Sequence, residues 1–490
     1  MEKPSKWSVL GIVGTGVFMC TLDSSIVNVS LPAIAKYFGV PVGSEVEWVI
    51  IAYLVIIAST LLTIGRLADR LGHRPIWLSG LGVFTLGSAL CGAAPTLWLL
   101  ICARVLQGIG GSLLMAVSPA MLTKAFPPNE RGRALGFNST IVALGISAGP
   151  ALGGWITETA SWRWIFYVNV PIGIAGAIAT MIVLPREHEN ARKRFDVAGA
   201  VLLGIALASL TTLLSVGTDA GWTSPIALGL AAAIVVAAAL FAWQERRHEQ
   251  PLLDHHLFEN RLFAWATASL VLSFLAGFAT SFLLPIYLEQ LRGFTLEKTG
   301  LILTAFPIVV AVVAPISGHL ADRFGTRWLA SIGMAVLCAG LLLMSRLDEH
   351  TSIWGVIWPQ LIAAFGMAMF QSPNNSAIMG AAPRDRQGVA AGMLATGRTM
   401  GQSISVAIAG AVFVGLGAAA AGRALLQHPH DPQLSLTFLR GFQWALRTCA
   451  IISAAAIVTS LLRGNERAHS SSEANPASGP LSSSRISPAT

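Results

Sequence analysis

The chain alternates between long apolar runs and short segments that hold most of its charges. A membrane-spanning helix needs about 20 apolar residues, and fourteen runs meet this criterion. They are centred on residues 8–34, 47–66, 75–94, 97–122, 136–157, 164–184, 197–216, 225–243, 263–288, 299–320, 328–345, 352–379, 388–416 and 440–462. The pattern predicts an all-α integral membrane protein with fourteen transmembrane helices.

The composition also indicates a membrane protein. Apolar residues make up 54% of the 490 residues and charged residues 11%, whereas ordinary soluble domains have about 25% charged residues. Too few polar residues remain to cover a soluble core, and a disordered chain would be far less hydrophobic. The first apolar run continues to about Leu31 with no signal-peptidase site, which favours a retained first span over a cleaved signal.

The net charge of +8 is explained by membrane topology. If the N-terminus lies inside, 22 of the 32 Lys and Arg residues fall in inner segments, 7 in outer segments and 3 inside spans. Because basic loops stay in the cytoplasm, both termini are predicted to be cytoplasmic in a multi-pass protein of the cytoplasmic (inner) membrane. The basic residues are scattered over short loops, so no nucleic-acid partner is expected.

A repeated charged block divides the chain into two halves. GRLADRLGHR at 65–74 and GHLADRFGTR at 318–327 match at seven of ten positions, and duplicated halves are typical of transporters. Eight predicted spans separate the copies, where two six-helix halves would need six, so the spans at 197–216 and 225–243 are predicted to be inserted. The predicted domains are an N-terminal six-helix bundle (1–186), an inserted helix pair with linkers (187–250), a C-terminal six-helix bundle (251–465) and a disordered cytoplasmic tail (466–490).

Five sequence blocks resemble signatures of the major facilitator superfamily, and in particular of its fourteen-span drug:proton antiporters. GRLADRLGHR is similar to the signature between the second and third spans, LDSSIVNVSLP (22–32) to that of the first span, and RVLQGIGGS (104–112) to the fourth-span arginine motif. SWRWIFYVNVPIG (161–173) resembles the start of the sixth span. The fifth-span antiporter motif is matched by Gly136, Gly145, Gly149, Pro150, Gly153 and Gly154. The resemblance covers about residues 8–465 and implies the major facilitator fold and multidrug efflux.

Two charges inside spans are candidates for proton coupling. Asp23 lies mid-span, where a charge costs ~2.5–3.5 kcal/mol, so we expect it to face a cavity and to take up a proton; a packing role with a hydrogen-bonded neighbour is the alternative. Arg104 shares a helix face with Gln107 and Gly108 and can pair with a carboxylate or a polar cavity wall. The resemblance gives Arg104 a role in proton transfer, and a structural ion pair is compatible with that role.

The resemblance also gives the repeated block the role of a conformational latch, formed by Gly65, Asp69, Arg70, Gly72 and Arg74 and by Asp322 and Arg323 in the second copy. Asp69, in the loop after the second span, can cap the next helix or pair with a cationic group across the halves.

The fifth-span motif predicts close helix packing. Gly145, Gly149 and Gly153 are four residues apart and form one flat face, with Gly154 beside it and a kink expected at Pro150. We expect this face to pack on a helix of the other half. The resemblance links the motif to antiporters, and ordinary helix packing is the alternative.

The polar residues inside spans suggest a substrate cavity. The candidates are Ser30, Gln107, Gln371, Asn374, Asn375 and Arg398. Those near Pro373 are expected to make a polar break in the span 352–379, either at the inner end of the cavity or at a helix interface. No carboxylate lies well inside a second-half span, although cation exporters of this family often have one there. Neutral and anionic substrates therefore stay open.

Other kinds of site find no support. The pairs His255–His256 and His428–His430 lack a third metal ligand, and the five cysteines lie in apolar runs without CxxC spacing. No nucleotide-binding loop or catalytic triad occurs, so we expect no enzyme activity and no cofactor, and an ion gradient as energy source. The predicted function is proton-driven efflux of hydrophobic small molecules or drugs by a monomer in the lipid bilayer. The alternatives are export of a specific host-made metabolite and a non-transporting membrane scaffold or sensor.

Overall fold

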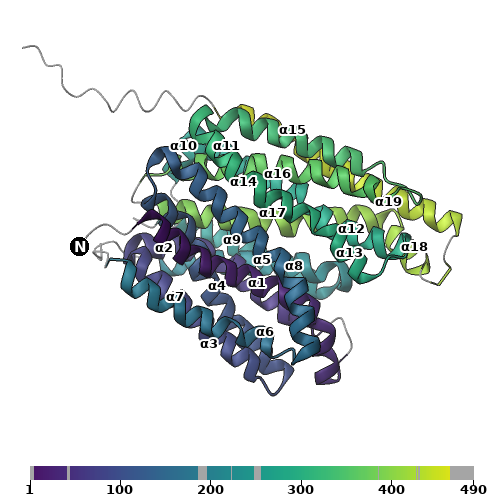
Figure 1. The fold of residues 1–490 in the computed structure, drawn as a ribbon, viewed down its shortest axis with the longest axis horizontal. Helices are drawn as coiled ribbons and strands as arrows, with labels where there is room; N and C mark the ends of the chain where they lie inside the picture. Colours follow the sequence, from purple (N-terminus) through teal and green to yellow (C-terminus); the bar gives the residue numbers. More distant parts are fainter. Residues whose placement is uncertain are drawn as a thin grey trace, which may run out of the picture.

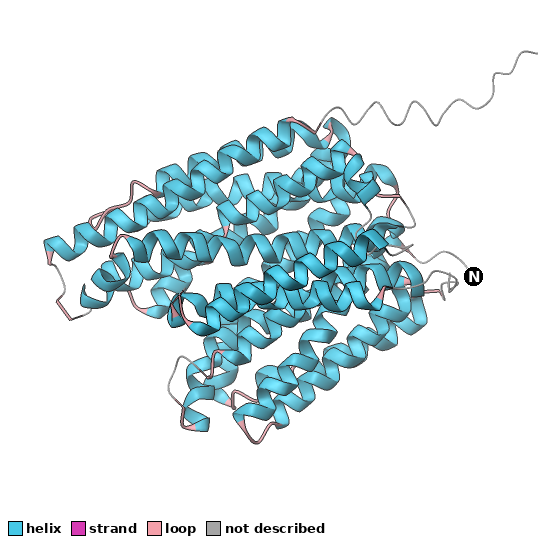
Figure 2. Ribbon diagram, turned by 180° about the vertical axis from the view of Figure 1, so that it is seen from behind, coloured by secondary structure: helices cyan, strands magenta, loops and turns pink. Residues whose placement is uncertain are grey.

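The computed structural model describes residues 5–40, 45–185, 196–221, 223–247, 255–383, 386–425, 427–428 and 431–463. Within these ranges every regular element is a helix (Figures 1 and 2). Thirteen helical segments are long and apolar enough to cross a membrane, or fourteen if the bent pair α17–α18 forms one span. The predicted all-α membrane fold is confirmed. The predicted domain boundaries near residues 186 and 250, and the tail 466–490, lie outside the described residues.

The helices form two bundles with a helix pair between them in sequence. The N-terminal bundle contains α1 (Lys6–Phe38), α2 (Trp48–Leu71), α3 (His73–Ala93), α4 (Leu97–Ala125), the short η1 (Pro128–Glu130), α5 (Arg131–Thr159), α6 (Trp164–Tyr167) and α7 (Asn169–Val183). The inserted pair is α8 (Val197–Ala220) and α9 (Pro225–Arg247). The C-terminal bundle contains α10 (His255–Glu259), α11 (Arg261–Gly277), α12 (Ala279–Ile286), η2 (Tyr287–Leu291), α13 (Leu296–Leu303), α14 (Ala305–Phe324), α15 (Thr326–Met344), α16 (Ile353–Ala381), α17 (Gln387–Gly415), α18 (Ala418–Leu425) and α19 (Pro432–Leu461).

Each bundle has its own apolar core, and the two bundles pack against each other on two sides. Helix α5 packs on α14 and α16, and helices α2 and α4 pack on α17. The inserted helix α8 lies against both α2 and α17, where Leu62, Leu203 and Met393 belong to one apolar cluster. The inserted pair therefore covers the α2–α17 side of the interface between the bundles.

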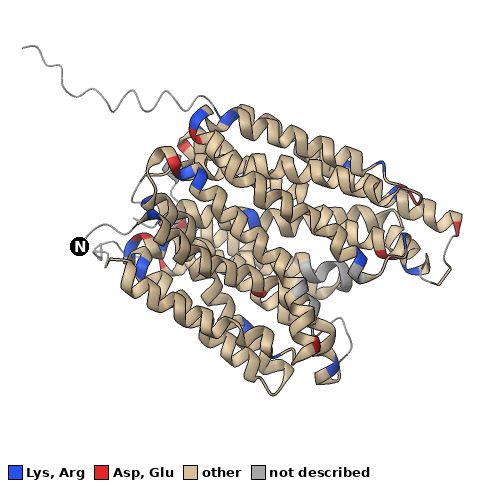
Figure 3. Ribbon diagram, in the orientation of Figure 1, with Lys and Arg blue, Asp and Glu red and all other residues tan. Residues whose placement is uncertain are grey.

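Charged residues mark one end of the molecule. Lys and Arg gather where α2 and α14 end and where α3, α5 and α15 begin, at the left of Figure 3. We call this the basic end; its residues include Arg66, Arg70, Arg74, Arg131, Arg133, Arg323 and Arg327. Helix α1 starts at this end (Figure 1) and α19 finishes there, since Ser460 lies 3.1 Å from Ser331 in the second turn of α15.

Two boundary predictions differ from the structure. Helix α19 begins at Pro432 rather than near residue 440, because Asp431 caps it by accepting hydrogen bonds from the backbone of Gln433 and Leu434. The polar break expected around Pro373 is wrong, because α16 runs without interruption from Ile353 to Ala381.

Hydroxyl groups on neighbouring helices explain how prolines are accommodated inside spans. A proline cannot donate to the carbonyl four residues before it, and this carbonyl needs another partner in a membrane. For Pro373 the carbonyl belongs to Met369, and the hydroxyl of Ser317 on α14 donates to it at 3.0 Å.

The same arrangement occurs at two more prolines in the part of the chain that is described. Ser25 on α1 donates to the carbonyl of Ile146 at 2.7 Å, which is the carbonyl freed by Pro150. Thr140 on α5 donates to that of Ala311 at 2.7 Å, which is freed by Pro315. The second of these bonds crosses between the bundles.

Candidate transport site

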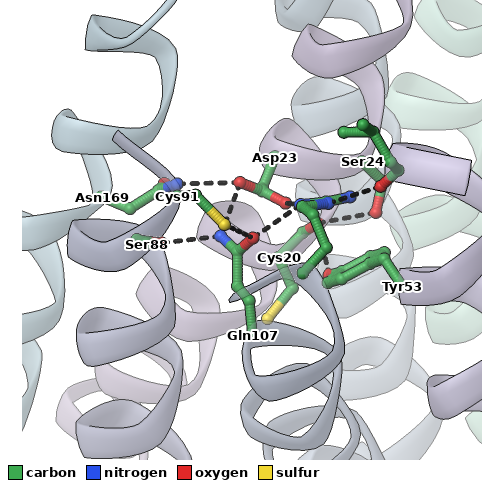
Figure 4. A network of polar contacts seen from close by, with 10 residues as sticks. Cys20, Asp23, Ser24, Tyr53, Ser88, Cys91, Gln107 and Asn169 are labelled. Atoms are coloured by element: carbon green, nitrogen blue, oxygen red, sulfur yellow. Dashed lines mark hydrogen bonds and ion pairs between the residues drawn. The ribbon is translucent and has the colours of Figure 1, made fainter. Parts of the chain in front are cut away.

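A buried polar network lies inside the N-terminal bundle and centres on Asp23 of α1 (Figure 4). The Nη1 atom of Arg104, on α4, donates to Asp23 Oδ2 at 2.6 Å. The other carboxylate oxygen, Oδ1, accepts from Gln107 Nε2 at 2.8 Å and from Asn169 Nδ2 at 3.0 Å. Asp23 is 0% exposed and Arg104 1%, so both charges of the pair are removed from solvent.

The surroundings hold the guanidinium of Arg104 in place. Its Nε donates to the Val49 carbonyl at 2.8 Å, its Nη1 also reaches Gln107 Oε1 at 2.6 Å, and its Cζ lies 4.1 Å from the centre of the Tyr53 ring. Gln107 in turn donates to Ser88 on α3 at 2.6 Å. Helices α1, α2, α3, α4 and α7 thus all contribute to one network around a single ion pair.

This geometry corrects two expectations from the sequence. Asp23 does not face the cavity described below, because its carboxylate is enclosed by side chains of its own bundle. Gln107 belongs to the Asp23 network and not to the cavity wall. Asn169 and Ser88 were missed by the sequence analysis; both are polar residues inside or at the start of predicted spans, which was the available signal.

The two copies of the repeated block make equivalent contacts at the basic end. The carboxylate of Asp69 accepts from the backbone N–H groups of Gly388 at 2.7 Å and Val389 at 2.9 Å, at the start of α17. The carboxylate of Asp322 accepts from those of Gly132 at 2.8 Å and Arg133 at 3.0 Å, at the start of α5. Each aspartate therefore caps a helix of the opposite bundle, where the free N–H groups and the helix dipole favour an anion.

Paired glycines let these helices approach closely. A Cβ atom at Gly65 would lie 2.3 Å from the Gly388 carbonyl oxygen, and one at Gly318 would lie 2.1 Å from that of Gly132. Neither position has room for a side chain, so backbone meets backbone at both contacts. We call the two aspartates and these four glycines the latch.

The latch is helical, which differs from the expected loop. Asp69 and Arg70 lie in the last turn of α2, Arg74 lies in the first turn of α3, and Gly72 between them has φ +91°. Gly325 has φ +86° at the equivalent place in the second copy. Arg74 donates to the Met181 carbonyl at 3.3 Å, within its own bundle. Arg323 is exposed at the end of α14.

Two basic residues near the latch escaped the sequence analysis. Lys124 Nζ lies 2.8 Å from His73 Nδ1, and His73 Nε2 lies 3.9 Å from Asp69 Oδ1. The only signal for His73 was its position inside the repeated block.

The glycine face of α5 has a different partner from the one expected. Added Cβ atoms at Gly145 and Gly149 would lie 2.1 Å from Thr21 Oγ1 and 2.3 Å from Ser25 Oγ, both on α1 of the same bundle. Gly153 also meets α1, at Ile26, whereas Gly154 has nothing within 4 Å. The glycines that contact the other bundle lie nearer the basic end. A Cβ at Gly136 would be 2.6 Å from the Ala314 carbonyl of α14. The side chain of Pro150 lies outside the described residues.

A cavity of about 40 Å³ lies between the two bundles. Its polar lining comes from Ser118 on α4, Asn138 on α5, Gln371 and Asn375 on α16, and Arg398 on α17. The remaining lining is apolar: Met115, Pro119, Leu135, Val142, Leu270, Phe274, Leu394 and Ala395. Helices of both bundles therefore share one amphipathic chamber.

Three of the six expected cavity residues line this chamber: Gln371, Asn375 and Arg398. Ser30 is 1% exposed and bonds to the Ile26 carbonyl and Thr157. Asn374 is 0% exposed; it donates to the Ala266 carbonyl and accepts from Arg463. Neighbouring positions on a helix point in different directions, so the run 371–376 cannot all face one space. Within the described residues, no group of three His, Cys, Asp or Glu could hold a metal.

Known proteins share both this sequence pattern and this fold. The model of the Major Facilitator Superfamily matches residues 13–405 and 266–488. The riboflavin transporter RibZ of Clostridioides difficile is 35% identical over 83% of this chain and 88% of its own. The multidrug resistance protein Stp of Mycobacterium tuberculosis (strain CDC 1551 / Oshkosh) is 35% identical over 81% of this chain and 74% of its own. The crystal structure of the human organic anion transporter MFSD10 has the same fold, with a TM-score of 0.67 at 16% identity over 94% of this chain and all of the other. A bundle pair with an intervening cavity, a repeated interbundle latch and these relatives lead to one conclusion: the chain belongs to the Major Facilitator Superfamily of membrane transporters.

Proposed function

We propose that this transporter exports hydrophobic small molecules in exchange for protons. It lies in the cytoplasmic membrane, with its basic end facing the cytoplasm. The observation that carries the proposal is the Asp23–Arg104 pair. A carboxylate buried in a membrane protein is expensive and marks a proton or ion pathway in transporters. No other carboxylate among the described residues is both fully buried and ion-paired in this way.

Proton transfer to Asp23 would change the balance of this network. A neutral carboxyl group no longer compensates the charge of Arg104, which cannot deprotonate. The guanidinium would then have only neutral partners, among them the Val49 carbonyl, Gln107 and the rings of Tyr53 and Phe166. Protonation would therefore favour a rearrangement of α1 against α4, and α1 also packs along α5, which reaches the other bundle. This gives a physical route from one proton to a movement of the bundles.

The latch would control the other side of the cycle. In this conformation both aspartates tie the bundles together at the basic end. Breaking these contacts is required before the chamber can open toward that end. Alternating access by rocking of the two bundles about the central chamber follows this logic.

Export of one specific metabolite is the second candidate function. Five polar side chains in the chamber could recognise a defined pattern of hydrogen-bonding groups, and a relative named as a riboflavin transporter fits such selectivity. A broad panel of dyes and antibiotics decides between the two functions, because a metabolite exporter would move few of them.

The test is transport by purified protein in liposomes, with Asp23→Asn as the variant and Glu158→Gln, an exposed carboxylate at the far end of α5, as matched control. Asp23→Asn should lose efflux driven by a pH gradient. It should keep exchange of labelled for unlabelled substrate, which needs no net proton movement. Efflux by Asp23→Asn at the wild-type rate would remove Asp23 from the coupling mechanism. Loss of both activities, with the protein still folded, would point to a structural role for the pair.

A further inference from the structure

The chamber between the bundles has an uncompensated positive charge. Among the described residues that line it, none is Asp or Glu, and Arg398 is the one ionisable group. The three aspartates that join helices of these bundles lie outside the chamber lining: Asp23 in its own network, and Asp69 and Asp322 in the latch.

Arg398 differs from Arg104 in its partners. Arg104 has an ion pair, two further hydrogen bonds and an aromatic ring. Arg398 makes no hydrogen bond, ion pair or ring contact with any residue that the structure describes. A guanidinium is always charged and offers five donors in a flat fork that matches a carboxylate or another oxyanion. An arginine held at the wall of an amphipathic chamber without a protein anion is suited to an anion supplied by a ligand.

The other polar groups of the chamber point to the rest of the ligand. Asn375 Oδ1 is a buried acceptor without a hydrogen-bond partner, so a ligand donor would satisfy it. Ser118 donates to Asn138 Oδ1 at 3.2 Å, which leaves the Asn138 amide group as a donor. The remaining lining, with Phe274, Leu270 and Met115, suits an apolar body.

We infer that this chamber, which has room for only a few water molecules in this conformation, widens when the bundles move apart and then selects hydrophobic organic anions. Such a ligand carries one acidic group, bound on Arg398, and a hydrogen-bond donor on the side of Asn375. This inference rests on the proposed transport function for its cargo, but selectivity of binding is independent of proton coupling. Organic cations are disfavoured, because they would meet Arg398 with no carboxylate to offset it. The apolar lining excludes strongly hydrated anions such as inorganic phosphate, since they would lose their water without equivalent partners.

The experiment compares binding of two matched probes to the full-length protein in nanodiscs. The probes are 7-methoxycoumarin-3-carboxylate and its neutral carboxamide, which share one ring system and differ in charge. The variants are Arg398→Gln, Arg398→Lys and, as control, Arg447→Gln, whose arginine lies over Trp444 on α19 and not in the chamber. The wild type should bind the acid about 10- to 100-fold more tightly than the amide, which is the range for a charge-assisted hydrogen bond to a buried partner.

Arg398→Gln should remove this preference while amide binding changes by less than about threefold, which also shows that the variant is folded. Arg398→Lys should restore part of the preference, and Arg447→Gln should keep all of it. Equal affinities of the wild type for acid and amide, or an unchanged preference in Arg398→Gln, would overturn the inference. If Arg398→Gln fails to fold, the wild type alone tests the inference. If the wild type binds a trimethylammonium derivative of the same coumarin more tightly than the acid, the inference is also overturned.

Repeating the measurement in Asp23→Asn separates this inference from the proposed function. The acid preference should persist there, because Asp23 does not line the chamber. In the wild type, absence of proton-driven efflux together with an intact acid preference would refute only the coupling mechanism. Intact efflux by the wild type without an acid preference would refute only the role of Arg398.

Discussion

Weakening the latch should shift the transporter toward the conformation that is open at the basic end. In Asp69→Asn the side chain keeps one acceptor oxygen, so one of its two bonds to the backbone of Gly388 and Val389 is lost. The negative charge at the start of α17 is lost as well. The substitution leaves the apolar contacts between α2 and α17 unchanged, so its effect reports on the hydrogen bonds and the charge alone.

The magnitude follows from the two lost interactions. A hydrogen bond to a charged group contributes about 1.5–3 kcal/mol, and a charge at a helix N-terminus about 0.3–1 kcal/mol. Taking about 2 kcal/mol for their sum at this partly hydrated end, the population ratio of closed to open conformations falls about 30-fold, at about 1.4 kcal/mol per tenfold. Asp322 joins a different helix pair. If the two contacts are independent, the ratio of closed to open conformations should fall by about 1,000-fold in the double variant Asp69→Asn/Asp322→Asn.

Spin-label distances in nanodiscs measure this shift. Labels at Glu158 on α5 and Lys298 on α13, both exposed at the end opposite the latch, should move closer as the basic end opens. The five native cysteines are replaced first. Asp348→Asn serves as matched control, because Asp348 is exposed in the loop before α16 and its carboxylate accepts hydrogen bonds only from its neighbours His350 and Thr351. An unchanged distance distribution in the double variant would show that the aspartates do not bias the conformational equilibrium.

Three further outcomes test the helix contacts and the charge balance. Gly149→Leu should lower thermal stability and transport, because a Cβ at this position would lie 2.3 Å from Ser25 Oγ. The control Gly154→Leu should change thermal stability and transport little. Equal effects of the two substitutions would contradict the packing described for α5. Ser25→Ala should reduce the free energy of unfolding by about 1 kcal/mol in the wild type. In the Pro150→Ala background it should have almost no effect, because the substituted alanine supplies an N–H to the Ile146 carbonyl. Full additivity of the two substitutions in this double-mutant cycle would exclude coupling between Ser25 and Pro150. If Asp23 carries one proton per cycle, the net charge moved across the membrane depends on the substrate. It is zero charges for a monovalent cation, one for a neutral substrate and two for a monovalent anion. Each charge contributes ~2.3 kcal/mol per 100 mV of membrane potential. Flux in liposomes at fixed pH and valinomycin-set potentials measures this series, and a strong potential dependence for a monovalent cation would require a second proton site.

Local sequence was sufficient for the spans and for the family. Hydropathy is summed along a single helix, so apolar runs of about 20 residues identify transmembrane helices without knowledge of their neighbours. The repeat at 65–74 and 318–327 and the motif order likewise follow from the chain alone. The sequence also showed that Asp23 and Arg104 are charges inside spans, since both interrupt apolar runs.

Only the tertiary structure decided which groups meet. The partner of Asp23 lies 81 positions away, and that of Asp69 lies 319 positions away. The Ile146 carbonyl, which has no helical donor because of Pro150, accepts a hydrogen bond from Ser25 on another helix. These pairings depend on the rotation of each helix about its axis and on the helix beside it, and a spacing of four residues gives neither. For this reason the sequence located the glycine face of α5 but assigned it to the wrong bundle, and it named Arg398 without revealing that the chamber leaves its charge unpaired.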